Sequence, residues 1–267
     1  MSHNRSTRHA RDTPQHALRK RLSQNFLTDT ATARMIVRAS GVTRDDLVLE
    51  AGPGDGMLTR HLIGAARQVH AYEKDRRYAE RLRRRYADDD RVRCHLADFR
   101  DVRAPREPFA VVANVPFAVT TDIVRWCLAA RSLTSATLVT QLEFARKHTG
   151  DFGRWTKLAV AVWPETALEL GPRIGRRQFH PVPRVDAALL HLHRRPEPLL
   201  PHQEMGEYRR LVELGFSGVG GSLAASLRRA YPSGRVQRAC AAADIDRNEP
   251  VGLVSPERWA RLFAALR

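Results

Sequence analysis

The chain has 267 residues, 43% of them hydrophobic, which supports one sizeable core and a small second domain. No apolar run is long enough to span a membrane, and the three cysteines form no CxxC pair, so we expect neither a metal site nor a disulfide framework but a reducing compartment. The formal charge of +16, carried mostly by arginine, favours a polyanionic partner such as a nucleic acid over a mere excess of arginine in the composition.

The first three quarters of the chain read as a basic arm followed by alternating strands and helices. Residues 1–22 are polar and predict a disordered arm that either holds RNA phosphates or is a solvated tail. A helix capped by Thr28 or Asp29 then runs to Ser40, before Gly41. Further helices are expected at 57–66, 76–86 and 120–130, and strands at 47–49, 69–72, 92–96, 109–113, 137–140, 158–162 and 187–192. This alternation of buried strands with helices predicts a doubly wound α/β sheet.

A change of pattern follows at Arg194-Arg195-Pro196-Glu197-Pro198, where two prolines predict a domain boundary. We therefore expect one domain over residues 23–195 and a smaller helical domain over residues 196–267. The helices expected in the smaller domain cover residues 204–214, 223–230, 236–243 and 256–266.

A glycine-rich turn follows the strand at 47–49. Its sequence, Leu49-Glu50-Ala51-Gly52-Pro53-Gly54-Asp55-Gly56, lets the backbone approach a cofactor closely, although alone it fits a plain turn or an NAD site equally well. Glu73 ends the next strand, where a carboxylate can accept hydrogen bonds from ribose hydroxyls. Asp98 lies just past the third strand, where a carboxylate can reach an adenine amino group. Each carboxylate alone is more often a helix cap, but three consecutive strand ends with suitable groups favour a nucleoside cofactor.

The tetrapeptide Asn114-Val115-Pro116-Phe117 follows the strand at 109–113 and points to chemistry on an amine. The adenine N6 amine is a poor nucleophile, because its lone pair is delocalised into the ring. The side-chain oxygen of Asn114 and a backbone carbonyl, that of Val115, can hold its two hydrogens, while Pro116 stiffens the loop and Phe117 stacks on an unstacked base. The alternative is an Asn that closes an X-Pro turn with a Phe packed in the core. The combination with the glycine turn favours methyl transfer to an adenine amine.

These motifs together resemble the rRNA adenine N6-methyltransferase family, which includes the housekeeping small-subunit dimethyladenosine transferases and the Erm macrolide-resistance enzymes. The resemblance covers residues 24–193. Besides the residues above, it rests on Gln24-Asn25-Phe26-Leu27, Gln141-Leu142-Glu143-Phe144-Ala145-Arg146-Lys147 and Phe179-His180-Pro181-Val182-Pro183-Arg184-Val185-Asp186. The segment Thr149-Gly150-Asp151-Phe152-Gly153-Arg154-Trp155 is similar to actinobacterial Erm enzymes. Val115 and Phe117 stand where the housekeeping branch usually has Leu and Tyr; the Erm branch more often has Ile followed by Tyr or Phe, so Val115 departs from both patterns.

The resemblance implies a Rossmann-like class I methyltransferase sheet with a small C-terminal all-α domain that contacts RNA. It implies a cytoplasmic, monomeric enzyme that uses S-adenosyl-L-methionine to methylate one adenine in the peptidyl-transferase loop of 23S rRNA, either protein-free or in an assembling large-subunit precursor. Such methylation blocks macrolide, lincosamide and streptogramin B binding. The residues that would contact the cofactor by resemblance are Asn25, Leu27, Gly52, Gly54, Gly56, Glu73, Asp98 and Asn114, and those at the target base are Asn114, Val115, Pro116 and Phe117.

Other functions remain open at the level of the sequence. They are a housekeeping 16S rRNA adenine dimethyltransferase, a DNA adenine-N6 methyltransferase and a non-enzymatic RNA-binding factor on the same fold, with an NAD-dependent dehydrogenase as a distant fourth. The sequence does not distinguish monomethylation from dimethylation.

Overall fold

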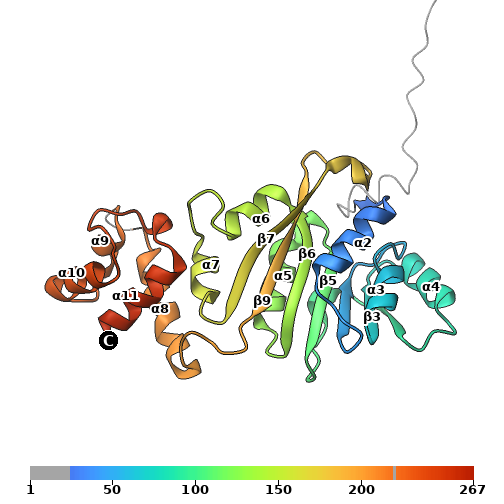
Figure 1. Cartoon of the computed structure of the whole chain (residues 1–267), viewed down its shortest axis with the longest axis horizontal. Coiled ribbons are helices and arrows are strands. Elements are labelled where there is room, and N and C mark those ends of the chain that lie inside the picture. Colours follow the sequence, from blue (N-terminus) through green and yellow to red (C-terminus); the bar gives the residue numbers. More distant parts are fainter. Residues whose placement is uncertain (1–24, 219–220) are drawn as a thin grey trace, which may run out of the picture.

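A seven-stranded sheet forms the centre of the computed structural model, which describes residues 25–218 and 221–267 (Figure 1). The strand order is β4-β3-β2-β5-β6-β9-β7. The strands are β2 (Leu47–Ala51), β3 (Gln68–Glu73), β4 (Val92–Leu96), β5 (Phe109–Asn114), β6 (Leu133–Gln141), β7 (Thr166–Ile174) and β9 (Ala187–Arg194). A separate antiparallel pair joins β1 (Phe26–Leu27) to β8 (Phe179–His180). The basic arm expected at residues 1–22 lies outside the described residues.

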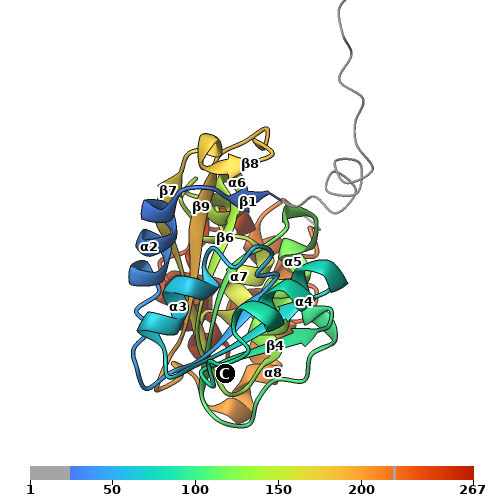
Figure 2. The same ribbon diagram turned by 90° about the vertical axis from the view of Figure 1, so that its right-hand side faces the viewer.

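Helices cover both faces of the sheet. In β5, Phe109, Val111 and Ala113 point into one core cluster, whereas Ala110 and Val112 point into the other. The first cluster includes α5 (Thr120–Ala129) and the second includes α2 (Thr30–Ala39) and α3 (Thr59–Ala65), which lie on opposite sides in Figure 2. The remaining helices of this region are α4 (Arg76–Arg85), α6 (Leu142–His148) and α7 (Lys157–Val162). Strands buried on both faces are typical of a doubly wound sheet, so the predicted fold class is confirmed.

The first predicted helix shows how local sequence sets an element boundary. Asp29 caps α2, since its carboxylate accepts a hydrogen bond from the Thr32 N–H at 2.7 Å. Gly41 follows the helix with φ +67°, a left-handed conformation that ends helices and suits glycine. Both boundaries were predicted from these residue types.

The far end of the sheet differs from the prediction. The five strands from β4 to β6 are parallel, but β9 pairs antiparallel with β6, and β7 pairs antiparallel with β9. The expected strand at 158–162 is wrong: this segment is helix α7, capped by Thr156, whose hydroxyl accepts from the Ala159 N–H at 3.2 Å. A five-residue apolar run does not distinguish a strand from a buried helix turn.

The missed strand is β7, the edge strand of the sheet. It carries Gly171 and Pro172, two residues that usually interrupt strands, and its register with β9 shifts between Leu170 and Arg173. Proline is tolerated on an edge strand at such an irregularity, because its missing N–H need not serve a ladder hydrogen bond. The resulting sheet is mixed at one end and parallel where the site lies.

The C-terminal helices pack around a hydrophobic cluster of their own, beyond β7 and α7 in Figure 1. They are α8 (Met205–Gly215), α9 (Leu223–Leu227), α10 (Ser233–Ala242) and α11 (Pro256–Leu266). Val160 of α7 joins this cluster, and the Tyr208 hydroxyl donates to the Val160 carbonyl at 2.9 Å. The helical region predicted from the sequence is thus present, and α7 connects it to the sheet. Within the described residues, no helix has the length and apolar character to cross a bilayer.

Gly215, at the end of α8, is expected to be essential for the packing of this region. A Cβ there would lie 2.4 Å from Trp259 Cη2 and 2.7 Å from Leu223 Cδ1, so the buried Trp259 would have to shift. We expect Gly215→Ala to lower the free energy of unfolding by about 1–3 kcal/mol in urea denaturation.

Gly206→Ala is the matched control in the same helix, because within residues 25–218 and 221–267 the only atom near its Cβ is a flexible Arg210 nitrogen at 3.9 Å. It should leave stability unchanged or raise it by about 0.5–1 kcal/mol through helix propensity. Equal effects of the two substitutions would contradict this account.

Candidate functional site

Two adjoining cavities open at the edge of the sheet where the parallel strands end, and Gly52 lines both. The larger has a volume of about 400 Å³ and the smaller about 40 Å³. The larger is lined by Phe26, Leu27, Thr28, Glu50, Gly52, Pro53, Asp55, Gly56, Met57, Leu58, Arg60, Arg85, Asn114 and His180. The smaller is lined by Ala51, Gly52, Tyr72, Glu73, Lys74, Ala97, Asp98, Phe99, Arg100, Pro116, Val119 and Ile123.

Strand register brings the predicted motifs together. Leu49 of β2 pairs with Val111 of β5, so Gly52 and Asn114, each three residues further on, end neighbouring strands at the same level. Adjacent strands are about 4.8 Å apart. Glu73 of β3 pairs with Leu96 of β4, and Asp98 follows two residues later. Four consecutive parallel strands thus deliver the glycine turn, two carboxylates and the amide to one edge.

The glycine turn has a shape that side chains would prevent. Gly52, Gly54 and Gly56 have φ values of +67°, +55° and +79°. A Cβ at Gly54 would lie 2.5 Å from the Phe26 ring, and a Cβ at Gly52 would point toward Pro116 at 4.0 Å. Backbone therefore faces the cavities directly, as close approach of a ligand requires.

Glu73 stabilises this turn through a hydrogen bond to its backbone. One carboxylate oxygen accepts a hydrogen bond from the Gly54 N–H at 3.0 Å, and the other accepts from the Asp75 N–H at 2.9 Å. The side chain is 2% exposed, and burial raises its pKa. Each carboxylate oxygen can accept a second hydrogen bond, so Glu73 can also serve a hydroxyl in the smaller cavity.

Glu50 is a second buried carboxyl group beside the same turn. It is 1% exposed, and the Thr59 hydroxyl donates to it at 2.7 Å. Burial raises its pKa to about 8, with a smaller contribution from the neighbouring Glu73. Glu50 belongs to the predicted motif but was not among the predicted site residues, although it lines the larger cavity.

Asp98 has the capping role that the sequence analysis gave as the alternative to cofactor binding. Its carboxylate caps a short 3-10 turn by accepting from the Arg100 N–H at 3.0 Å and forms an ion pair with the Arg100 guanidinium at 2.7 Å. These contacts lower its pKa and keep it ionised. Asp98 also lines the smaller cavity, where it presents an acceptor.

Asn114 is fixed by one specific contact. Its Nδ2 donates to the Asn25 carbonyl at 2.7 Å, which orients the amide. No donor from residues 25–218 or 221–267 reaches Asn114 Oδ1 or the carbonyl oxygen of Val115. Two acceptors next to each other in the chain are thus unused beside the cavities.

The rest of the tetrapeptide divides between the cavity and the core. Pro116 lines the smaller cavity, while the Val115 side chain is 2% exposed in the first core cluster. Phe117 is half-buried and packs against the second cluster, as the packing alternative anticipated. Among the other predicted residues, Leu27 and Gly56 line the larger cavity; Asn25 and Gly54 contribute through their backbones.

Some of the lining residues were not predicted. Arg60 reaches the larger cavity from α3, and nothing in its local sequence marks it. Arg85 reaches it from α4, the strongly basic helix whose arginines the sequence predicts either to bind phosphates or to form a solvated face. His180 reaches it because β8 pairs with β1, with His180 opposite Phe26; its peptide bond to Pro181 is cis. The resemblance implies that the loop from Phe179 to Arg184 lies near the target base, with a purely structural proline-rich loop as the alternative; the position of His180 in the cavity wall depends on this long-range pairing.

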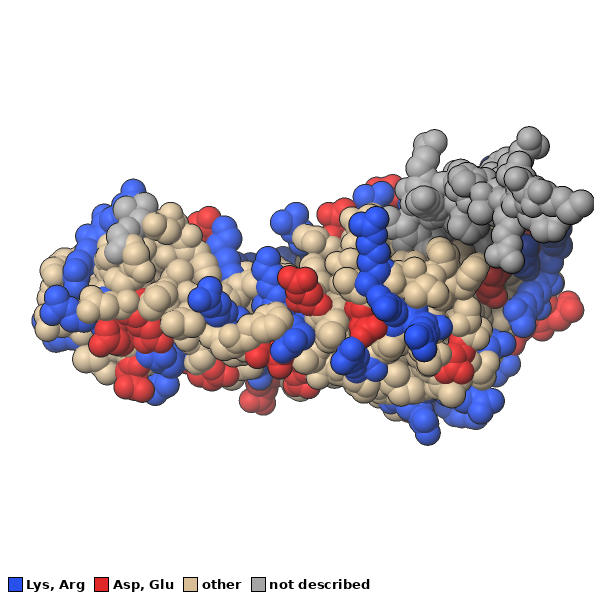
Figure 3. Space-filling model, turned by 90° about the horizontal axis from the view of Figure 1, so that it is seen from above, with Lys and Arg blue, Asp and Glu red and all other residues tan. Residues whose placement is uncertain are grey.

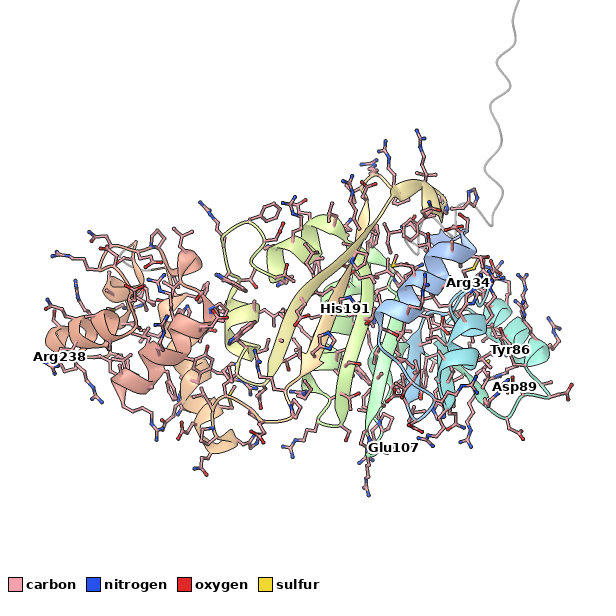
Figure 4. The ribbon with its side chains drawn as sticks, in the orientation of Figure 1. Arg34, Tyr86, Asp89, Glu107, His191 and Arg238 are labelled. Atoms are coloured by element: carbon pink, nitrogen blue, oxygen red, sulfur yellow. The ribbon has the colours of Figure 1, made fainter. Side chains whose placement is uncertain are left out.

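The surroundings of the site are basic, whereas its interior holds carboxyl groups. Figure 3, which views the molecule from above its orientation in Figure 1, shows Lys and Arg side chains over the middle of this face. The buried His191 lies within the sheet on β9, next to the Thr137 hydroxyl at 3.0 Å and away from the strand ends (Figure 4). It therefore takes no part in the site.

Comparisons with known proteins agree with this geometry. The family model described as ribosomal RNA adenine dimethylase matches residues 15–267. The chain is 49% identical over 243 residues to an rRNA methyltransferase of Streptomyces thermotolerans, covering 91% of this chain and 81% of that protein. It is 48% identical to an rRNA adenine N-6-methyltransferase of Streptomyces fradiae, covering 93% and 79%. The crystal structure of the 23S rRNA methyltransferase ErmE superposes with a TM-score of 0.87 at 47% identity, covering 91% of this chain and 99% of that one.

The buried Glu50 predicts a specific pH dependence of stability. Because its pKa is raised in the folded state to about 8, its protonated form contributes stability below the unfolded value near 4.5, and this contribution is lost as the pH rises through 8. Glu50→Gln keeps an acceptor for Thr59 and cannot ionise. We expect the difference in Tm, variant minus wild type, to increase steadily from pH 5 to pH 8 in thermal unfolding.

Asp45→Asn, an exposed carboxyl group on the loop before β2, is the control and should show no such trend. A pH-independent difference for Glu50→Gln would mean that Glu50 is ionised throughout.

Proposed function

This chain belongs to the ribosomal RNA adenine dimethylase family and is an rRNA adenine N6-methyltransferase, and we propose that it modifies an adenine in the peptidyl-transferase loop of 23S rRNA. Its seven-stranded mixed sheet with a helical C-terminal region matches the class I methyltransferase fold, as predicted. The relatives of nearly half identical sequence, among them a 23S rRNA methyltransferase, favour the Erm branch over the housekeeping one. Methylation there would confer resistance to macrolides, lincosamides and streptogramin B.

One observation in the site carries the chemical part of this proposal. Among the described residues, no donor reaches Asn114 Oδ1 or the carbonyl of the adjacent Val115, and the bond from Asn114 Nδ2 to Asn25 orients the amide. An exocyclic amine carries two hydrogens and needs two acceptors. The arrangement therefore suits an adenine N6 amine.

The cavities fit S-adenosyl-L-methionine as the cofactor. The turn at Gly52 offers bare backbone, Glu73 keeps acceptor capacity for ribose hydroxyls, and the ionised Asp98 can accept from an adenine amino group. Glu50 and Asp55 add carboxyl groups to the larger cavity, beside Arg60 and Arg85, and a cationic ligand there would favour the ionised form of Glu50. When bound, this cofactor supplies an electrophilic methyl group on a sulfonium centre.

The chain's own residues then act by positioning. Asn114 and the Val115 carbonyl hold the N6 hydrogens, which draws the nitrogen lone pair out of conjugation with the ring. Pro116 restricts the loop, and the half-buried Phe117 offers its remaining exposed surface to the base. No general base is required, since the amine can lose its proton to solvent after transfer. Holding the reactants in line supplies much of the rate.

We assign residues 23–195 to catalysis and residues 196–267 to a helical domain that contacts RNA. The substrate is rRNA free of ribosomal proteins or in an assembling large-subunit precursor, which places the enzyme in the cytoplasm, and we expect it to act as a monomer. These assignments rest on family resemblance and on the arginine-rich composition.

The proposal is tested by methyl transfer from labelled S-adenosyl-L-methionine to protein-free 23S and 16S rRNA, with the product mapped by mass spectrometry. We expect N6-methylated adenine in the 23S peptidyl-transferase loop, and the same assay gives the ratio of monomethyl to dimethyl product. Labelling of 16S rRNA alone would support the housekeeping reading, and labelling of DNA in competition would support the DNA enzyme. Either result would overturn the proposal.

Asn114→Ala tests the role of the amide. Loss of one fixed acceptor for the reacting amine should lower kcat about 100-fold or more, by analogy with removal of a single positioned hydrogen-bonding group. Thermal unfolding should show that the variant is folded. Asn248→Ala, an exposed asparagine in the C-terminal region, serves as the control and should keep wild-type turnover. Near wild-type turnover of Asn114→Ala would refute the assignment.

A further inference from the structure

A third cavity lies beside the catalytic one and has no role in the chemistry described above. It is an open groove of about 550 Å³ between the start of α6, the loop after α6 and the segment before β9. Its walls include Leu142, Arg146, Phe152, Arg176, Arg184 and Val185. The groove thus combines apolar and aromatic surface with three arginines.

Phe152 is the most unusual side chain of this groove. It is a phenylalanine with 51% of its surface exposed, and the Arg146 guanidinium lies over its ring at 4.2 Å from the centroid. Arg146 also forms an ion pair with Asp151, which fixes the guanidinium. An exposed aromatic ring stacked with an arginine is the kind of flat surface on which nucleic acid bases stack.

The loop that carries Phe152 is held in place by its own contacts. Gly150 has φ +73°, and a Cβ there would lie 2.5 Å from the Trp155 ring, so the loop backbone packs directly on Trp155. The Gly153 N–H donates to the Gly150 carbonyl at 2.9 Å, and the Trp155 N–H donates to the Gly252 carbonyl at 2.7 Å. These contacts therefore fix the turn that carries Phe152.

The charge of the groove is suited to phosphate. Of its two acidic wall residues, Asp186 is already paired: it accepts from the Arg173 guanidinium and from the Arg176 N–H. The other, Glu143, is exposed and offsets the charge of one of the three arginines in the wall. Asp151 is paired with Arg146. The Arg184 side chain has no ion-pair partner among the described residues, so the groove keeps excess positive charge.

The groove and the larger catalytic cavity are lined by neighbouring segments of the chain. His180 lines the larger catalytic cavity, and Arg184 to Asp186, four to six residues later, line the groove. Across the sheet, Asn114 pairs with Val139 of β6, whose end leads into Leu142, and the Leu142 N–H donates to the Asp186 carbonyl at 3.0 Å. Leu142 thus lies on the neighbouring strand's path, three residues beyond the partner of Asn114. The spacing between strands and the rise per residue place Asn114 and Leu142 about 11 Å apart.

We propose that this groove holds a nucleotide adjacent to the target adenine in the substrate RNA, with its base stacked on Phe152 and its phosphate held by Arg184 and Arg176. The inference rests on the proposed function, because it names the part of the RNA that flanks the reacting base. A base taken out of a stack exposes its neighbours, and an aromatic platform next to the reaction site holds such a neighbour without reading its identity. The excess positive charge favours this occupant over an apolar peptide.

Kinetics with a short RNA hairpin that contains the target adenine test the proposal. Phe152→Ala should raise KM for the RNA about tenfold, the scale of one lost base–aromatic stack, with kcat and the affinity for S-adenosyl-L-methionine little changed. Phe152→Tyr keeps a ring and should stay within about twofold of wild type. Leu199→Ala removes an equally exposed side chain outside the groove, since Leu199 is also 51% exposed, and should leave KM unchanged.

A spectroscopic measurement separates stacking from a structural effect on the loop. With 2-aminopurine placed on one side or the other of the target adenine, binding of wild-type enzyme should quench its fluorescence at one of the two positions, and Phe152→Ala should lose that quenching. An unchanged KM for Phe152→Ala, or fluorescence quenching that persists with this variant, would overturn this inference. The proposed function would still stand in that case, provided that the wild-type enzyme methylates the RNA. Absence of any RNA methylation by wild type would instead refute the proposed function. Capture of a peptide that competes with RNA for the groove would also overturn the inference.

Discussion

The parallel pairing of β2 with β5 at the centre of the sheet determines where every functional group lies. Its register sets the glycine turn and Asn114 level with each other on neighbouring strands. The pairings of β3 and β4 on one side then bring Glu73 and Asp98 to the same edge. A shift of one residue in a strand would exchange its two faces and remove its end from this row. Because both faces of these strands are buried in close-packed clusters, such a shift would mismatch the packing on both faces and is strongly disfavoured.

The site separates two electrostatic environments within one strongly basic chain. Glu50 and Glu73 are buried beneath the glycine turn, where their carboxyl groups meet a hydroxyl and backbone N–H groups rather than arginine. Burial raises the pKa of both groups, which a nearby cationic ligand would reverse in part by favouring their ionised forms. Arginines line the walls of the cavities, as Arg60 and Arg85 do, and of the neighbouring groove, where Arg176 and Arg184 can reach phosphate. Buried carboxyl groups and bare backbone thus surround the proposed cofactor site, and arginines line the adjacent groove.

Much of this arrangement could be predicted from the sequence, because it depends on local signals. Because Gly52, Glu73, Asp98 and Asn114 lie at or just after strand ends, the sequence predicted that they would meet at one edge of the sheet. The structure places all four at that edge. What could not be predicted depends on contacts between distant segments. Helix α7 looked like a strand because five apolar residues carry no clear period, and its helical form is stabilised by the capping Thr156 and by packing against α8. Strand β7 was missed because Gly171 and Pro172 are tolerated only at an irregular edge, a fact of its position in the sheet.

The same distinction explains which site residues the sequence revealed. Residues that act through their chemical type at a strand end were found, whereas Arg60, Arg85 and His180 reach the cavity from elements whose positions depend on tertiary packing. The bond from Asn114 Nδ2 to the Asn25 carbonyl joins residues 89 positions apart, and no pattern in either segment indicates it. Yet this bond orients the Asn114 amide and so determines where its oxygen lies relative to the substrate. The motif supplies the functional group, and a contact from a distant part of the chain sets the direction in which that group can act.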